Sequence, residues 1–199
     1  MDTKLTGKTR IESDLIGARE IPAEALYGVQ TLRGIENFSI SKFRLSEYPL
    51  FIKGLAITKM AAAMANFELG LLTVEQKDAI IAACGEILDG KHHDQFPVDM
   101  IQGGAGTTTN MNANEVIANR ALELMGHERG EYHYCSPNDH VNCSQSTNDA
   151  YPTAIHIGMY FKHLQLLPHL EELIASFRKK GEEFSQIIKM GRTQLEDAV

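Results

Sequence analysis

Residues 102–126 read QGGAGTTTNMNANEVIANRALELMG, and this stretch predicts how the chain folds around its most polar segment. Gly103, Gly104 and Gly106 come directly before an uninterrupted run of residues that ends at Gly126. Glycine permits the tight backbone turns that precede a helix, and a glycine just past a helix end is a common stop signal. We therefore expect a glycine-rich turn and then a helix whose first turn carries hydroxyl and amide side chains.

The sequence before this stretch predicts two more helices and an irregular beginning. Residues 50–69 are rich in Ala, Met, Ile and Leu and are followed by a glycine, which indicates a buried helix. Thr73 followed by Gln76 forms a capping-box pattern at the start of a second helix. Glycines and a proline interrupt short apolar stretches in residues 10–38, so we expect extended segments and turns there.

A long helix is expected after the quoted stretch, beginning at about Ala150. Asp149 is a natural N-cap residue, and Pro152 is tolerated in a first helical turn. The pattern continues to about Lys180 with more apolar side chains than the remaining sequence can cover, which implies a helical bundle or a subunit interface. Because a helical pattern is still developing near Val199, we expect a fragment of a longer protein.

The composition is typical of a packed globular protein and argues against several classes of partner. Hydrophobic residues make up 43% and charged residues 23%. The net charge of -7 and the absence of a basic run argue against nucleic acid. Without a signal-like start or an apolar run of about 20 residues, we expect a cytoplasmic protein with no membrane partner. Cys84, Cys135 and Cys143 are irregularly spaced, which favours reduced thiols.

Two segments concentrate small hydrogen-bonding side chains at expected helix starts. Residues 107–112 follow the glycine-rich turn, and residues 144–148 directly precede the long helix. Free backbone N–H groups and the positive end of the helix dipole make each segment a candidate anion pocket. Residues 191–194, GRTQ, add another hydroxyl and amide. The hypothesis is that these loops converge on a small dianion, and the alternative is plain helix capping.

Other candidate sites are weaker. Residues 92–94, HHD, lack the spacing of known metal motifs, so no metal site is expected. The GGAGTTTN segment lacks the lysine of a phosphate-binding loop and does not indicate a nucleotide. His133, His140 and His156 have no recognisable nucleophile and orienting group beside them, which favours structural roles.

Several long stretches together resemble the fumarase/aspartase superfamily of lyases. They are residues 20–38, 102–126, 137–154 and 191–199. Where this chain reads GGAGT, SQSTN and GRTQ, fumarases typically read TGSGT, SQSSN and GRTH, so the chain is more similar to the aspartate ammonia-lyases. The difference at Gln194 is chemically meaningful, because an amide and an imidazole offer different donors and charge to a substrate.

The resemblance implies reversible anti-elimination of ammonia from L-aspartate to give fumarate, without a required organic cofactor and with divalent metal activation as an option. It implies a mainly α-helical fold. A small N-terminal domain with a short β element, residues 1–148, would precede the beginning of a central helical bundle, residues 149–199. The implied partners are L-aspartate, fumarate and further copies of the chain in a homotetramer with shared active sites.

The resemblance also implies substrate contacts, residue by residue. Those expected at the substrate carboxylates are Thr107, Ser146, Thr147 and Thr193, and those expected near the amino group or leaving ammonia are Asn148 and Gln194. Removal of a Cβ proton spreads negative charge into the adjacent carboxylate. Hydrogen-bond donors held in fixed positions around that carboxylate stabilise this charge. The family's catalytic base is a serine in a GSSxMPGKxNP loop. That loop does not occur in these 199 residues, so we expect an incomplete site that is inactive alone.

Two alternatives remain open at this point. A fumarate hydratase is disfavoured by Gln194 and Gly104, and the second anion site that fumarases carry is in doubt because Ser136 replaces a histidine there. A noncatalytic assembly module is the alternative from another class. In that case the polar loops only cap helices, and the long helix forms an interface.

Overall fold

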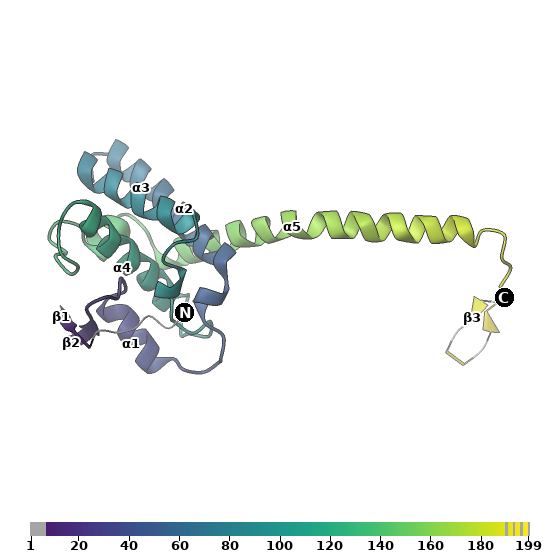
Figure 1. Ribbon diagram of the computed structural model, residues 1–199, viewed down its shortest axis with the longest axis horizontal. Helices are drawn as coiled ribbons and strands as arrows, with labels where there is room; N and C mark the ends of the chain where they lie inside the picture. Colours follow the sequence, from purple (N-terminus) through teal and green to yellow (C-terminus); the bar gives the residue numbers. More distant parts are fainter. Residues whose placement is uncertain (1–6, 190, 193, 196, 199) are drawn as a thin grey trace. The chain divides into compact units, whose positions relative to one another are not determined.

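The computed structural model describes residues 7–189, 191–192, 194–195 and 197–198. The chain divides into two compact units, which meet between Tyr160 and Phe161 in the sequence. The first unit holds a hairpin and a group of packed helices (Figure 1). The mainly helical fold with a short β element is as predicted, whereas the expected domain boundary between residues 148 and 149 stays a prediction.

The chain begins with a β-hairpin followed by a short helix. Strands β1 (Thr9–Asp14) and β2 (Gly17–Pro22) pair antiparallel, with Thr9 opposite Pro22 and Asp14 opposite Gly17. The prediction of extended segments is therefore confirmed for the hairpin. It is wrong for α1 (Val29–Asn37), which is helical although its sequence is short and contains an internal glycine.

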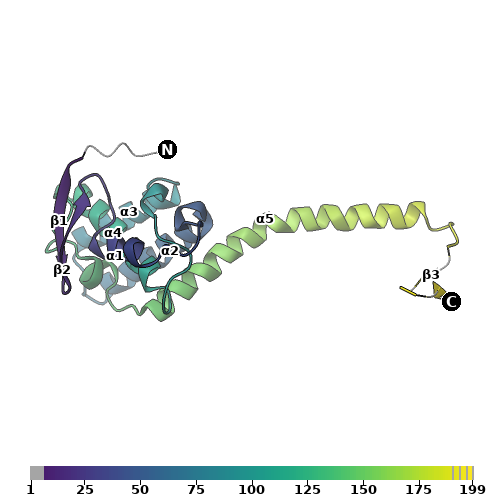
Figure 2. The same cartoon turned by 90° about the horizontal axis from the view of Figure 1, so that it is seen from below.

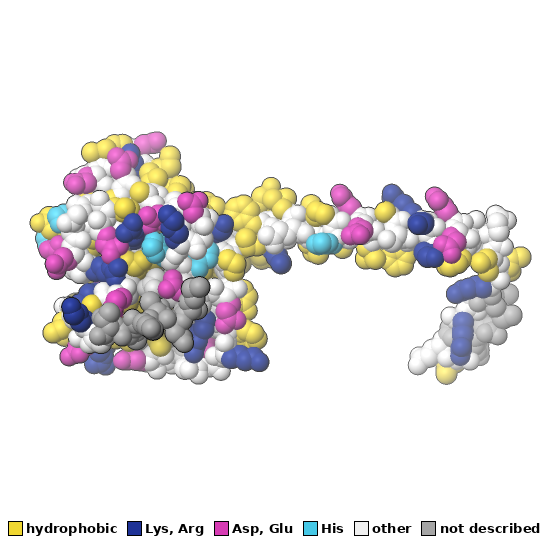
Figure 3. Space-filling model, in the orientation of Figure 1, with side chains coloured by type: hydrophobic (Ala, Val, Ile, Leu, Met, Phe, Trp, Pro, Cys, Tyr) yellow, Lys and Arg dark blue, Asp and Glu magenta, His cyan; other side chains and the backbone are white. Residues whose placement is uncertain are grey.

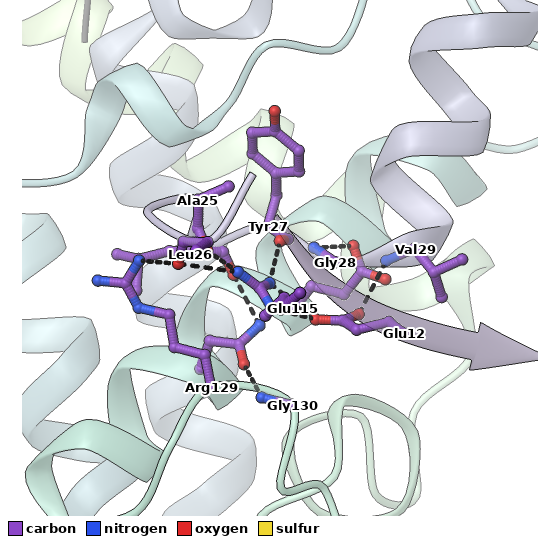
Figure 4. A network of polar contacts seen from close by, with 12 residues as sticks. Glu12, Ala25, Leu26, Tyr27, Gly28, Val29, Glu115, Arg129 and Gly130 are labelled. Atoms are coloured by element: carbon purple, nitrogen blue, oxygen red, sulfur yellow. Dashed lines mark hydrogen bonds and ion pairs between the residues drawn. The ribbon is translucent and has the colours of Figure 1, made fainter. Parts of the chain in front are cut away.

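Helix α1 forms because buried carboxylates of other elements bind its first turn. Glu115 accepts hydrogen bonds from the backbone N–H groups of Gly28, Gln30 and Thr31, at 2.7 to 3.0 Å. Glu12 of β1 accepts the N–H of Val29 at 3.0 Å, and Figure 4 shows both carboxylates directed at this helix start. Long-range acceptors thus satisfy N–H groups that a local cap would otherwise bind, which explains why local sequence did not reveal the helix.

Three longer helices form most of the core of the first unit. Helices α2 (Pro49–Glu68), α3 (Val74–Leu88) and α4 (Thr107–Leu124) pack against one another, as both ribbon views show (Figures 1 and 2). Their expected positions are confirmed. The predicted capping box is present: the Thr73 hydroxyl accepts the N–H of Gln76 at 3.2 Å, and the Gln76 side chain accepts the N–H of Thr73 at 3.1 Å.

Short helical turns flank these helices: one lies before α2, one between α3 and α4, and one after α4. They are η1 (Leu45–Glu47), η2 (His93–Gln95) and η3 (Pro137–Val141). Between η2 and α4, the buried carboxylate of Asp99 accepts the N–H groups of Ile40, Ser41 and Ile101 at 2.7 to 3.0 Å. These bonds hold the pKa of Asp99 at about 2. Asp99 therefore anchors the loop that leads into the glycine-rich turn.

Helix α2 is long and apolar enough to cross a membrane by length and composition alone. Its packing indicates a core helix, because Ile52, Leu55 and Ala56 are almost fully buried in the main hydrophobic cluster. Two polar side chains of α2, Lys59 and Asn66, are buried as well and bond to the loop before α5. A lysine and an asparagine within the helix are costly in hydrocarbon and fit a protein interior with hydrogen-bond partners.

The last helix, α5 (Thr147–Glu183), begins earlier than the sequence indicated. The Ser146 hydroxyl accepts the N–H of Asn148 at 3.2 Å, and the Ser146 carbonyl accepts the N–H of Asp149 at 3.1 Å. The prediction of Asp149 as the N-cap is therefore wrong. Ser146 has this role because a serine oxygen reaches the N–H two residues on, which places Asp149 inside the first turn.

Small residues allow α5 to approach α2 closely within the first unit. Ala154 and Gly158 are buried, and a side chain added at Gly54 of α2 would overlap the Ala154 carbonyl. From Phe161 onward α5 belongs to the second unit, where many apolar side chains are exposed along the helix (Figure 3). That unit also contains a pair of two-residue strands, β3 (Gly191–Arg192) and β4 (Asp197–Ala198).

Candidate functional site

The start of α4 lies directly against the first turn of α5. Gly106, the residue before α4, has a left-handed backbone with φ of 90°. A side chain added there would overlap the ring of Tyr151 in α5. Glycine is required at this position both for the backbone conformation and for the close approach of the two helices. The glycine-rich turn thus brings two helix N-termini to one place in the first unit.

A side chain from the preceding loop caps α4. Gly106 has no side chain, and Gln102 replaces the missing cap: its Oε1 accepts the backbone N–H of Thr109 at 3.0 Å. The amide Nε2 of Gln102 contacts the Thr109 hydroxyl as well. Thr107, in the same helical turn, is exposed, and within the described part of the chain no hydrogen bond engages its side chain. Its hydroxyl is therefore available to a ligand.

The loop before α5 is held by the half-buried amide of Asn142. The Oδ1 atom of Asn142 accepts hydrogen bonds from the amides of Asn110 and Asn114, both on α4, at 3.0 and 3.2 Å. The same oxygen accepts a 2.9 Å hydrogen bond from the Lys59 ammonium group of α2. Asn142 therefore connects α2, α4 and the loop that begins α5.

Asn110 also joins the two helix starts. Its Nδ2 atom donates to the Thr147 hydroxyl at 3.1 Å, so a residue in the second turn of α4 is bonded to the first residue of α5. Ser146 and Asn148, on either side of the half-buried Thr147, are exposed. The positive ends of two helix dipoles and several exposed donors thus meet in one region, which is electrostatically suited to a carboxylate.

Lys59 is the member of this cluster that the sequence did not indicate. It is fully buried, and its ammonium group donates to Gln145 Oε1 at 2.9 Å in addition to Asn142. Burial lowers the pKa of Lys59 to about 7. The signal available in the sequence was a lysine at the centre of the apolar segment 50–69, a position where an uncompensated charge is costly.

The structure places four of the predicted substrate-binding residues at the two adjoining helix starts: Thr107, Ser146, Thr147 and Asn148. Their roles toward a substrate stay predictions. Gln194 is exposed in the second unit. Thr193 lies outside the described residues.

Several of the other candidates from the sequence have structural partners. His92 bonds to Glu86 through Nε2 at 2.9 Å, and His93 bonds to the Ile87 carbonyl at 2.9 Å. The His140 Nδ1 atom accepts the N–H of Ser136 at 2.7 Å. Over the described ranges, no group of three or more His, Cys, Asp or Glu side chains has an arrangement that could hold a metal ion. Cys84, Cys135 and Cys143 are free thiols.

Comparisons with known proteins agree with this arrangement. A family model described as "Lyase" matches residues 17–199. The chain is 59% identical, over 96% of its length, to an aspartate ammonia-lyase of Pseudomonas canavaninivorans, and covers 40% of that protein. It thus spans about two fifths of the length of the curated relatives that it matches.

Solved structures show the same fold. A fumarate lyase:delta crystallin from Brucella melitensis, bound to cobalt, superposes with a TM-score of 0.91 at 53% identity, over 96% of this chain and 42% of that one. A class II fumarase from Schistosoma mansoni superposes with a TM-score of 0.85 at 38% identity, over 96% of this chain and 40% of that one. The family match over most of the sequence and these shared folds show that the chain belongs to the fumarase/aspartase superfamily of lyases.

Proposed function

We propose that the natural protein containing residues 1–199 is an aspartate ammonia-lyase and that this chain supplies part of its active site. The observation that carries the proposal is the hydrogen bond between Asn110 and Thr147, which joins the two helix starts bearing the candidate ligand-binding side chains. The name of the relatives at 56 to 59% identity supports the choice of reaction.

In the proposed reaction a base removes a proton from Cβ of L-aspartate, and the carbon–nitrogen bond at Cα then breaks. The electron pair of that bond leaves with ammonia, and the carbanion electrons form the double bond of fumarate. Thr107, Ser146 and Thr147, with Thr193, donate hydrogen bonds to the substrate carboxylates. Each hydrogen bond to a charged group contributes about 1.5 to 3 kcal/mol, so a few of them outweigh weak repulsion from the net charge.

The remaining proposed contacts concern the amino group. Asn148, exposed in the first turn of α5, and Gln194 lie near the substrate nitrogen or the departing ammonia in this proposal. A serine base and its loop are supplied from outside these 199 residues, so the chain by itself is inactive. No organic cofactor takes part. Divalent metal activation is compatible with the cobalt named for the Brucella structure, and no step requires it.

We further propose that the protein is a cytoplasmic homotetramer whose central bundle begins at residue 149. The support is the exposed apolar surface of α5 in the second unit, which includes Leu166, Leu170, Leu173 and Phe177. Such a surface is typical of a helix that packs against other helices in an assembly. In this arrangement neighbouring copies complete each active site.

A direct assay distinguishes the candidate reactions. The natural protein is mixed with L-aspartate, and ammonia and fumarate are measured together. We expect both products in equal amounts. Dehydration of malate without release of ammonia from aspartate would identify a fumarate hydratase instead. Absence of both reactions would favour a noncatalytic assembly module, in which Ser146 and Gln102 only cap helices.

A further inference from the structure

Lys59 is a buried lysine with no acidic partner among the described residues. Its side chain is fully buried, and its ammonium group donates to two amide oxygens, Asn142 Oδ1 and Gln145 Oε1. No ion pair joins Lys59 to a carboxylate anywhere in the described ranges of the chain. Proteins rarely bury a lysine in this way, because an unpaired buried charge is costly. Because no described carboxylate lies beside Lys59, an anion bound nearby would stabilise its protonated form.

The amides around Lys59 lead directly to the candidate site. The ammonium group requires Asn142 to present its oxygen, and this oxygen in turn faces the Nδ2 atom of Asn110. Asn110 Nδ2 then donates to the Thr147 hydroxyl. A hydroxyl that accepts a hydrogen bond on its oxygen keeps its own hydrogen free to donate. The sequence of contacts from Lys59 therefore leaves Thr147 as a donor toward a ligand.

We propose that Lys59 is a positioning residue of the dianion site: it orients Thr147 through Asn142 and Asn110, and a bound dicarboxylate supplies its missing counter-charge. This inference rests on the proposed function. Amides suit the role better than a carboxylate would, because a carboxylate beside Lys59 would cancel its charge permanently and would repel a dianion.

The proposal makes binding depend on protons. With a pKa of about 7, Lys59 is largely neutral at pH 8, and an anion nearby favours its protonated form. Dianion binding is therefore accompanied by proton uptake, and affinity falls as pH rises above 7. The titratable neighbour is Cys84 of α3, whose pKa burial raises to about 12, so its thiol stays protonated. The groups that face Lys59 from α4 and from the loop before α5 are the uncharged amide side chains named above.

The test uses succinate, a four-carbon dicarboxylate that cannot lose ammonia, and the natural protein. Calorimetric titration at pH 8 in two buffers of different ionisation enthalpy measures both the dissociation constant and the number of protons taken up. We expect uptake of a substantial fraction of one proton. For Lys59→Met we expect uptake to vanish and the dissociation constant to rise at least about tenfold, the factor of a one-unit pKa change.

Two further variants separate positioning from folding. Lys53→Met removes a lysine elsewhere on α2 and should change neither quantity. Asn142→Asp keeps an oxygen for Lys59 but places a negative charge beside it, so it should lower affinity and abolish uptake even if Lys59→Met does not fold. Wild-type protein that binds succinate with no proton uptake, or Lys59→Met that retains uptake, overturns the inference. Wild-type protein that does not bind succinate contradicts the proposed function itself.

Discussion

The amide of Asn110 donates a 3.1 Å hydrogen bond to the hydroxyl of Thr147, and this contact joins the second turn of α4 to the first residue of α5. The residues are far apart in the sequence, yet the bond places two helix N-termini beside each other. Each N-terminus carries free N–H groups and a partial positive charge. The junction therefore concentrates donors for an anion, and the predictions below concern its parts.

Thr147→Val should impair turnover, and the Asn110 amide that loses its acceptor should lower stability by about 1 to 3 kcal/mol. Valine has nearly the shape of threonine but cannot donate to a carboxylate. The loss of one hydrogen bond to a charged group, about 1.5 to 3 kcal/mol, corresponds to a fall in kcat/KM of roughly 10- to 150-fold. The measurement is fumarate formation from L-aspartate by the natural protein. Thr153→Val, at an exposed position of α5, serves as the control, and equal rates for the two variants would rule out a substrate contact for Thr147.

Gly106→Ala should destabilise the first unit more than Gly104→Ala does. Both glycines have positive φ, 90° and 69°, so each substitution introduces backbone strain of about 1 kcal/mol or more. Only at Gly106 would the new methyl group also overlap the Tyr151 ring, whereas Gly104 has open space. Overpacking typically adds about 1 to 3 kcal/mol. Denaturant unfolding of both variants gives the difference, and equal losses would show that α4 and α5 can separate without cost.

Gln102→Glu should separate helix capping from ligand binding. A carboxylate at this position still accepts the N–H and the hydroxyl hydrogen of Thr109, so the free energy of unfolding should change by less than about 1 kcal/mol. Its negative charge beside the start of α4 should weaken succinate binding. Calorimetric titration and denaturant unfolding test the two effects. Unchanged affinity would indicate that the anion does not bind near Thr107.

Glu115 should make the stability of the first unit depend on pH. Its side chain is 2% exposed, and burial raises its pKa to about 7 against the opposing effect of the donors from Gly28, Gln30 and Thr31. Because the folded pKa exceeds the ordinary value of 4.5, the native state binds more protons between these limits. The contribution of Glu115 to the free energy of unfolding is fully present below pH 4.5 and is lost as pH rises through 7. Its size is on the order of 3 kcal/mol.

Unfolding midpoints measured from pH 5 to pH 8 test this dependence. Glu115→Gln should flatten the profile in that range and should lower stability by about 1 to 3 kcal/mol, because an amide NH2 would face backbone N–H donors. Glu68→Gln, at an exposed position of α2, should reproduce the wild-type profile. A wild-type profile without a fall toward pH 8 would mean that the N–H donors outweigh burial and keep Glu115 ionised.

Local patterns were sufficient for much of the secondary structure. The capping box at Thr73 and the glycines before Thr107 mark helix starts through bonds and backbone angles that span only a few residues. Helix α1 could not be predicted in this way, because its first turn is bound by Glu115, which lies 84 to 87 positions further along the chain. Helix α5 begins a few residues earlier than the sequence predicts, because Ser146 and Asp149 are both good capping residues and only the fold selects Ser146.

In the candidate site, too, some features can be recognised from the local sequence and others depend on long-range packing. The sequence by itself determined which residues carry hydroxyls and amides at the helix starts, because these side chains are adjacent in the chain and need no partner to be recognised. Only the tertiary structure decided that Asn110 bonds to Thr147 and that Lys59 is buried beside Asn142. Distances between helices and the loss of water around a charge depend on how distant segments pack, and local residue patterns do not contain that information.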